Sequence, residues 1–346
     1  MLTIAVPPIA QPSTLPPPVV PQDPLGDLLA DASLAPAGIP TRLWADSLVG
    51  PLSEFLRRPG GRFRGRLVTL AWSLAGRHDR PHPSLPLVVE LLHAGSLIID
   101  DIQDGSVQRR GKAAFHRLVG IPVAINAGNW LYFRATKLLS QIDLPPATEL
   151  SLHRATAAAV QTCHEGQALD LSARIGDTCG GNIRAIVQTI SECKTGGLMG
   201  LAGILGATSA GADGWLTEAV RDFGVRLGVG LQMQNDLSEL TGAAGPLKHP
   251  EDLIHGRVTW PWAWAADRLP EGRFEPLRQR GARLAQGTGD AARLAGDLLE
   301  ALGPDPDRPV RDWLDAAFAA LDDAVGPHPA LESIRSEVRR LVGRYA

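Results

Sequence analysis

Three aspartates stand at the end of an apolar segment of the chain, at Asp100, Asp101 and Asp104. In residues 87–102 the apolar side chains recur every three or four positions, a spacing that predicts a helix. On that helix Asp100 and Asp104 lie one turn apart on the same face, with Asp101 beside them. Like charges at this spacing repel each other, and carboxylate oxygens are the ligands that Mg²⁺ prefers. The aspartates therefore predict a divalent metal site.

Two arginines, Arg109 and Arg110, follow these aspartates at a short distance along the chain. A guanidinium group donates hydrogen bonds in a planar fork that suits phosphate oxygens. The alternative interpretation is a solvated helix end followed by a basic loop. That alternative leaves unexplained why an apolar run leads straight into the acids and why arginines come next. We therefore expect acids and arginines to act on one phosphate-bearing ligand.

The elements that must position these residues are helices. Apolar spacings of three and four recur along much of the chain, whereas alternating β-branched runs are nearly absent. Proline and glycine clusters break the pattern at intervals. We predict an all-α domain of ten to twelve helices over residues 25–346. Residues 1–24 are rich in proline, which predicts a disordered tail.

Composition excludes several other classes of protein. A formal net charge of −3 over 346 residues gives no electrostatic basis for binding nucleic acid. The three cysteines, Cys163, Cys179 and Cys193, form neither a CxxC pair nor an even disulfide set, which favours a reducing cytoplasm. Residues 195–212 are too rich in small side chains for a membrane span and predict a tightly packed buried helix. The first ten residues lack the basic region of a secretory signal.

Residues 100–112 resemble the first aspartate-rich motif of the trans-isoprenyl diphosphate synthase (polyprenyl synthetase) family. The resemblance extends from about residue 51 to residue 261, with further landmarks in the family's order. They lie at 59–64, 90–93, 124–129, 166–170, 194–195, 232–239 and 252–259. The resemblance implies a single-domain, all-α isoprenoid-synthase-type bundle around a deep central pocket, usually as a homodimer.

The resemblance also implies how a metal cluster is held. Two acidic motifs face each other across the pocket mouth and bind three Mg²⁺ ions on an allylic diphosphate. Asp100 and Asp104 carry the ions of the first motif and Asp101 supports them. The second motif corresponds to Asn235, Asp236 and Glu239 in this chain.

Substrate contacts follow from the same resemblance. Lys194 and Arg109 bind the allylic diphosphate, and Gln232 offers a hydrogen bond on the ligand side. Arg64, His93 and Arg110 hold the diphosphate of isopentenyl diphosphate. Further substrate-binding residues are Arg62, Thr195 and Arg257. For His93 alone, an ordinary core histidine is the alternative, and for Lys194 a solvated lysine.

This sequence departs from the family pattern at three positions. Asn235 replaces an aspartate expected to touch metal, which should weaken metal binding. Gly61 stands where a lysine binds isopentenyl diphosphate, with Arg62 and Arg66 close enough in sequence to substitute. Arg257 stands where a lysine is usual, in a chain that uses arginine for most of its positive charge.

The sequence suggests a length for the prenyl product and leaves three hypotheses for the reaction. Ser96 and Gly95 lie four and five positions before Asp100, where a bulky aromatic residue would stop chain growth in this family, so C20 is the expected linear product. The first hypothesis is a prenyltransferase that elongates an allylic diphosphate with isopentenyl diphosphate. The second is a repurposed member, either a class I terpene cyclase or a transferase to another acceptor. The third is a non-catalytic partner subunit.

Overall fold

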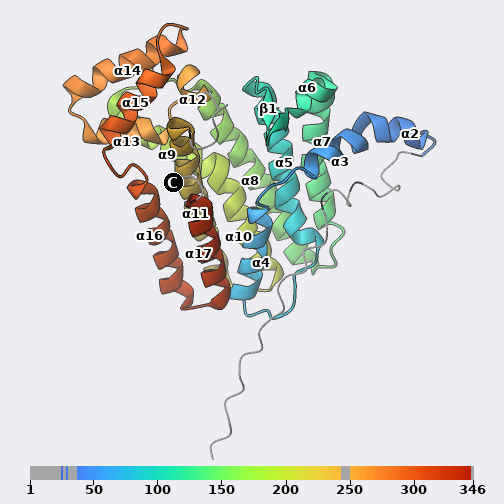
Figure 1. Ribbon diagram of the computed structural model, residues 1–346. Helices are drawn as coiled ribbons and strands as arrows, with labels where there is room; N and C mark the ends of the chain where they lie inside the picture. The colour runs from blue at the N-terminus through green and yellow to red at the C-terminus, as the bar shows by residue number, and fades with distance from the viewer. Residues whose placement is uncertain (1–24, 26–28, 30–36, 243–249, 344–346) are drawn as a thin grey trace, which may run out of the picture. The chain divides into compact units, whose positions relative to one another are not determined.

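Figure 1 shows the computed structural model, which describes residues 25, 29, 37–242 and 250–343. The predicted tail, 1–24, lies outside the described residues. Contacts within the chain divide it into two compact units, 1–58 and 59–346. The limits predicted for a single domain, 25–346, stay a prediction.

The described part of the first unit is one nearly continuous helical run. It comprises α2 (Thr41–Trp44), the π-helical turn η2 (Ala45–Val49) and α3 (Gly50–Leu56). Leu52 and Phe55 of this run are buried.

Long helices form the centre of the second unit. Helix α5 packs along α7, and α10 packs against α4, α8 and α11. Figure 1 lets the reader follow these helices by label. The bounds of the long helices are α4 (Phe63–Leu74), α5 (Ser84–Gln103), α7 (Ile121–Leu139), α8 (Pro146–Ser172), α10 (Gly197–Ser209) and α11 (Gly214–Thr241).

Helix α9 and the helices that follow α11 belong to the same unit. Helix α16 packs along α11, and α17 contacts α4. The bounds are α9 (Ile183–Ser191), α12 (Glu251–Ile254), α13 (Trp260–Arg268), α14 (Glu271–Ala285), α15 (Ala291–Leu302), α16 (Arg308–Val325) and α17 (Pro329–Val342). The remaining elements are the strands β1 (Gln108–Arg109) and β2 (Lys112–Ala113), α6 (Phe115–Val119), and the turns η3 (Gly180–Asn182) and η4 (Glu192–Gly196). The all-α prediction is confirmed, although short helices such as α2 and α12 make the number larger than ten to twelve.

Helix α10 shows why the small residues of this chain matter. A Cβ on Gly206 would lie 2.2 Å from the carbonyl oxygen of Val68, and one on Gly203 would lie 2.6 Å from that of Val220. Helices α4 and α11 therefore approach the α10 backbone closely, as only glycine allows. This confirms the prediction of a tightly packed buried helix at 195–212. Within the described residues, no helix has the length and apolarity needed to cross a membrane.

Candidate active site

A tight hairpin returns Arg109 to the end of helix α5. Strands β1 and β2 pair Gln108 with Ala113 and Arg109 with Lys112, which leaves Arg110 and Gly111 as a two-residue loop. Both loop residues have positive φ, +55° and +74°, as type I′ hairpin turns require. The hairpin places Nε of Arg109 2.8 Å from Oδ1 of Asp101.

Asp101 is completely buried and forms an ion pair with Arg109. Its second oxygen, Oδ2, has no hydrogen-bond partner among the described residues. Burial raises the pKa of this carboxyl group, although the hydrogen bond and charge of Arg109 oppose the rise. The supporting role of Asp101 at a metal site stays a prediction.

Lys194 reaches into the acidic cluster from the π-helical turn η4. Its Nζ lies 3.2 Å from Oδ1 of Asp100 and 2.5 Å from Oδ2 of Asp170 on α8. Burial alone would lower the pKa of Lys194, but the charges of Asp100 and Asp170 raise it, so the amine stays protonated. Burial likewise acts to raise the pKa of Asp100, yet Lys194 and Arg109 outweigh it and the pKa is lowered. Lys194 is thus paired with two carboxylates and is not a solvated surface lysine.

A glycine in α8 allows η4, which carries Lys194, to come close to this helix. A Cβ on Gly166 would lie 2.6 Å from the Cβ of Cys193 and 2.9 Å from the amide nitrogen of Lys194. Helix α8 therefore meets η4 closely, and Asp170 follows one turn after Gly166 on the same helix. Gln167, between them, donates to Oδ1 of Asp100 at 3.0 Å. Sequence reasoning included 166–170 as a landmark but missed Gln167 and Asp170 as site residues.

Arg257 completes the cationic side of the cluster. Its guanidinium group donates to Asp104 and lies 3.4 Å from Oδ2 of Asp170. Burial raises the pKa of Asp104, and the charge of Asp100 raises it further. The charges of Arg257 and Lys194 oppose this rise.

The second acidic motif lies on α11, where Asp236 is committed to local structure. Its Oδ1 accepts a hydrogen bond from Nε2 of Gln232 at 2.8 Å, and its Oδ2 accepts one from the backbone N–H of Trp260 at 3.0 Å. Gln232 in turn accepts from the hydroxyl of Thr195 at 2.8 Å. Burial raises the pKa of Asp236 to about 7. These bonds tie η4, α11 and the start of α13 together.

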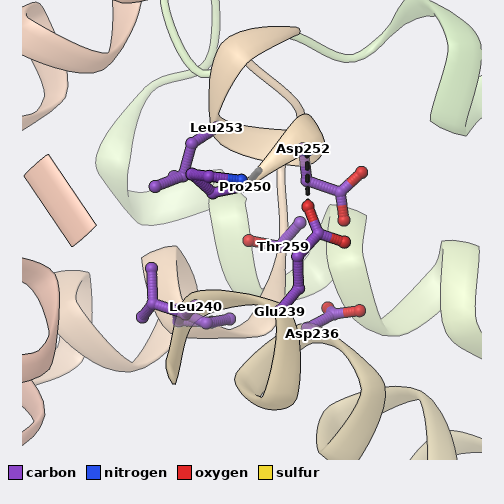
Figure 2. A pocket seen from close by; sticks show the side chains of 8 residues that line it. Asp236, Glu239, Leu240, Pro250, Asp252, Leu253 and Thr259 are labelled. Atoms are coloured by element: carbon purple, nitrogen blue, oxygen red, sulfur yellow. Dashed lines mark hydrogen bonds between the residues drawn. The ribbon is translucent and has the colours of Figure 1, made fainter. Parts of the chain in front are cut away.

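Glu239 and Asp252 line a small pocket beside Asp236, seen in Figure 2. Oε1 of Glu239 accepts a hydrogen bond from the backbone N–H of Asp252 at 2.8 Å. The pocket measures about 10 Å³, room for one water molecule. Burial and the charge of Glu239 raise the pKa of Asp252 well above its usual value. Asn235 is exposed on α11, and Asp252 is an acidic residue of this wall that sequence reasoning did not assign.

A basic cluster adjoins the acids along α5. His93 lies two turns before Asp100 on that helix, and Arg64 comes from α4. Burial, together with the charges of Arg64 and Arg110, lowers the pKa of His93 well below its usual value, so the imidazole is neutral. Burial also lowers the pKa of Arg64, whose buried Nε has no hydrogen-bond partner among the described residues. This cluster is suited to an anion.

The turn before α4 lies against the basic cluster. A Cβ on Gly60 would come within 2.6 Å of a guanidinium nitrogen of Arg110, so that side chain lies directly over Gly60. A Cβ on Gly61 would meet nothing within 4 Å. Arg62 has a left-handed backbone, with φ +44°, at the start of α4. Arg66 forms an ion pair with Glu337 of α17.

Gly95 and Ser96, the residues expected to set chain length, lie in contact with neighbouring backbone and side chains. A Cβ on Gly95 would lie 2.8 Å from the carbonyl oxygen of Gly128 and 3.0 Å from the ring of Tyr132. Gly95 therefore faces α7, and its smallness serves helix packing. The hydroxyl of Ser96 donates to the carbonyl oxygen of His93 at 2.8 Å. Replacing Gly95 by phenylalanine would disrupt the contact of α5 with α7 and so would not measure pocket depth.

The carboxylates of the site can bind a divalent cation once the lysine and arginine side chains that are paired with them move away. In the described part of the chain, no group of three or more acidic, histidine or cysteine side chains is already arranged around a metal position. Lys194, Arg109 and Arg257 are instead paired with the acids. Carboxylates nevertheless outnumber these cations, since the three of them contact Asp100, Asp101, Asp104 and Asp170. Oxygen ligands with surplus negative charge are what Mg²⁺ requires.

An all-α bundle in which acids from different helices meet, with arginines beside them, defines the isoprenoid-synthase class of helical proteins. The polyprenyl synthetase family model matches residues 45–284, and the chain belongs to that family. Geranylgeranyl pyrophosphate synthase of Geoglobus acetivorans is 30% identical over 208 residues, which cover 60% of this chain and 64% of that protein. A geranylgeranyl pyrophosphate synthase of Penicillium janthinellum is 32% identical over 66% of this chain and 61% of that protein. The matches thus span less than two thirds of these two relatives.

A solved structure extends the likeness over nearly the whole fold. The polyprenyl synthase from Caulobacter crescentus, complexed with calcium and isoprenyl diphosphate, superposes with a TM-score of 0.74 at 27% identity. The superposition covers 93% of this chain and 94% of that chain. The isoprenoid-synthase fold predicted from the sequence is therefore confirmed.

Proposed function

We propose that the chain is a Mg²⁺-dependent prenyltransferase that condenses an allylic diphosphate with isopentenyl diphosphate. The proposed product is a linear trans-prenyl diphosphate, and the C20 compound, geranylgeranyl diphosphate, is the expected length. One observation carries the proposal: helix α5 bears His93 of a basic cluster and Asp100 of an acidic cluster two turns apart. Two diphosphates can thus bind beside each other along one helix. The names of the two curated relatives support the C20 product.

The acidic cluster would bind the metal ions, three by the family resemblance. Asp100 and Asp104 would hold them from α5, while Asn235, Asp236 and Glu239 would contribute from α11. Bound Mg²⁺ neutralises the diphosphate of the allylic substrate and makes it a better leaving group. Asp236 accepts hydrogen bonds from Gln232 and Trp260, and each of its carboxylate oxygens keeps a further lone pair with which it could contact a metal.

The cationic side chains would hold the two substrates in reacting order. Lys194, Arg109 and Arg257, with Thr195 and Gln232, would bind the allylic diphosphate. Arg64, His93 and Arg110, with Arg62, would bind isopentenyl diphosphate. Because His93 is neutral, it can donate a single N–H to the diphosphate, whereas the arginines supply the charge. The alkene of isopentenyl diphosphate then attacks the allylic carbon, and the released diphosphate accepts the departing proton.

A second candidate is a repurposed member of the family, a terpene cyclase or a transferase to another acceptor. Two observations favour it. Gly61 removes a charge from the isopentenyl site, and Arg66, which could replace it, is held by Glu337. Asn235 also removes a charge from the second acidic motif. The third hypothesis, a non-catalytic subunit, does not account for the paired set of Asp100, Lys194 and Arg109.

We also propose that the protein forms a homodimer through α7. Exposed apolar side chains follow one face of that helix at Ile121, Ile125 and Phe133, and Phe133 is 75% exposed. Leu118 and Leu150 on the neighbouring helices are exposed too. A stripe of this kind is typical of a self-complementary interface.

The three unpaired cysteines support the proposed cytoplasmic location, because thiols persist in a reducing compartment.

Incubation with C10, C15 and C20 allylic diphosphates tests the proposed reaction. Each substrate is supplied with Mg²⁺, with and without isopentenyl diphosphate, and the products are identified by mass spectrometry after dephosphorylation. We expect C20 from the shorter substrates only when isopentenyl diphosphate is present. Consumption of an allylic diphosphate without isopentenyl diphosphate would support the cyclase instead.

A further inference from the structure

Arg257 contacts acids from three different elements. Its guanidinium group donates to Asp104 at the end of α5, lies 3.4 Å from Oδ2 of Asp170 on α8, and lies 3.7 Å from Oδ1 of Asp252 on α12. Its side chain is only 10% exposed. Asp104 is one of the two acids of α5 assigned to the metal. The guanidinium group thus occupies the space between the first acidic motif and the wall formed by Asp252.

The backbone around Arg257 is held firmly. Its N–H donates to the carbonyl oxygen of Asp252 at 2.8 Å, and the preceding carbonyl, of Gly256, accepts from the N–H of Ile175 at 2.8 Å. Gly256 has φ +64°, and a Cβ there would lie 2.7 Å from that of Ala285. Since the backbone is anchored on both sides, release of Asp104 must come from the side chain of Arg257.

Arginine and lysine differ in what they can do at such a position. A guanidinium group has five donors spread over a planar fork, so it can contact several carboxylates at once. A lysine ammonium group is a compact charge that is strongly hydrated and dissociates from a partner more readily. The arginine at 257, where the family resemblance leads us to expect lysine, therefore makes the contact with the acids more persistent.

We propose that Arg257 is an internal competitor of the metal, which pairs with Asp104 and contacts Asp170 and Asp252 in the metal-free protein, and which must leave Asp104 before a divalent cation binds. This inference rests on the proposed metal site of the prenyltransferase. It assigns Arg257 two opposite effects: the residue stabilises the metal-free fold and weakens metal affinity. After the metal binds, the released guanidinium group is free to contact the allylic diphosphate.

Direct metal binding tests this role without turnover. The concentration of free Mn²⁺ is followed by electron paramagnetic resonance in titrations of the full chain without substrate, for wild type, Arg257→Gln and Arg257→Lys. Because a contact with a charged group contributes about ten- to a hundredfold to an affinity, we expect Arg257→Gln to bind Mn²⁺ at least about tenfold more tightly than wild type. Arg257→Lys should lie between the two.

Arg278→Lys is the matched control. Arg278 also bridges elements, since it donates to the carbonyl oxygens of Ile175 and Gly176 and pairs with Glu275, but it contacts none of the site acids. Its replacement should leave the Mn²⁺ affinity unchanged. Thermal unfolding is recorded in parallel, with EDTA and with excess Mn²⁺. The melting temperature of Arg257→Gln should fall below wild type in EDTA, and Mn²⁺ should largely remove the difference.

The outcomes separate the inference from the function on which it rests. Unchanged or weaker Mn²⁺ binding by Arg257→Gln overturns the inference, as does a loss of melting temperature that is equal with and without Mn²⁺, which indicates a merely structural role. Asp104→Asn tests the metal site itself. If Asp104→Asn binds Mn²⁺ as tightly as wild type, the proposed metal site fails and the inference fails with it. If Asp104→Asn loses affinity but Arg257→Gln gains none, only the inference fails.

Discussion

At the scale of single residues, Gly61 and Gly60 are neighbours with opposite surroundings. Gly61 has open space at its Cβ position and no left-handed φ, so a lysine fits there without strain. Gly61→Lys should therefore lower the KM for isopentenyl diphosphate by about ten- to a hundredfold, the contribution of one charge-assisted contact. Steady-state kinetics with the allylic substrate saturating measures this value.

Gly60→Ala is the contrasting substitution at this turn. Its new methyl group displaces the guanidinium group of Arg110, which lies 2.6 Å from the Cβ position. The KM for isopentenyl diphosphate should rise while that for the allylic diphosphate stays nearly unchanged.

If Gly61→Lys has no effect on the KM for isopentenyl diphosphate, the cluster of Arg64, His93 and Arg110 binds something else.

The pKa of Asp236 predicts how the stability of the metal-free protein depends on pH. Burial raises this pKa to about 7, above the usual value of 3.8 in the unfolded chain, so the folded state binds the proton more tightly. The stabilising contribution of the proton is complete below about pH 4 and is lost as the pH rises to about 7. In EDTA, the free energy of unfolding should therefore fall between pH 5 and pH 7, and Asp236→Asn should flatten this slope. Denaturant titrations across the range decide it, and an equal slope in the variant would contradict the assignment.

At the scale of elements, α10 depends on glycine for its close contact with α4. Gly206→Ala places a methyl group 2.2 Å from the carbonyl oxygen of Val68, so the helices must separate. Overpacking of this kind costs about 1–3 kcal/mol, and we expect at least that loss in the free energy of unfolding. Gly296→Ala in α15 is the control, since its Cβ would meet nothing within 4 Å and should stabilise the chain by roughly 0.4–1 kcal/mol. Equal effects of the two substitutions, measured in urea, would contradict this packing.

The positions of helices could be predicted where apolar side chains recur at one regular spacing over a long segment. The apolar spacing of 87–102 predicts a helix, and α5 spans Ser84–Gln103. The hairpin at 108–113 could not be predicted, because strands of two residues carry no periodic pattern. Gly95 shows a second limit: the sequence places it on a helix, but which face packs on α7 depends on tertiary structure.

The site, too, has a part that the sequence predicts and a part that depends on tertiary structure. The acids of α5 and the arginines after them are recognisable because they are local in sequence. The pairing of Arg257 with Asp104 joins residues 153 positions apart, and no local signal predicts it. Asp236 could be named as an acid of the second motif, but its bond to the backbone of Trp260 depends on how α13 begins.

At the scale of the whole molecule, the α7 stripe predicts the oligomeric state. Phe133→Asp puts a charge in the proposed interface and should shift the protein from dimer to monomer. Trp215→Asp is the control, because Trp215 is also exposed, at 60%, but lies on α11. Sedimentation analysis at micromolar concentration distinguishes the species. A Phe133→Asp variant that remains dimeric would exclude this face as the interface.

The central claim is that the acidic cluster of α5 drives a metal-dependent condensation. The most direct measurement is the rate of diphosphate release from a C15 allylic diphosphate and isopentenyl diphosphate at saturating Mg²⁺, in wild type and in Asp100→Ala. Since Asp100 is assigned to the ions that stabilise the leaving diphosphate, the variant should be slower by orders of magnitude, and EDTA should stop the wild type. Release in Asp100→Ala at the wild-type rate, or in wild type with EDTA, would contradict the account.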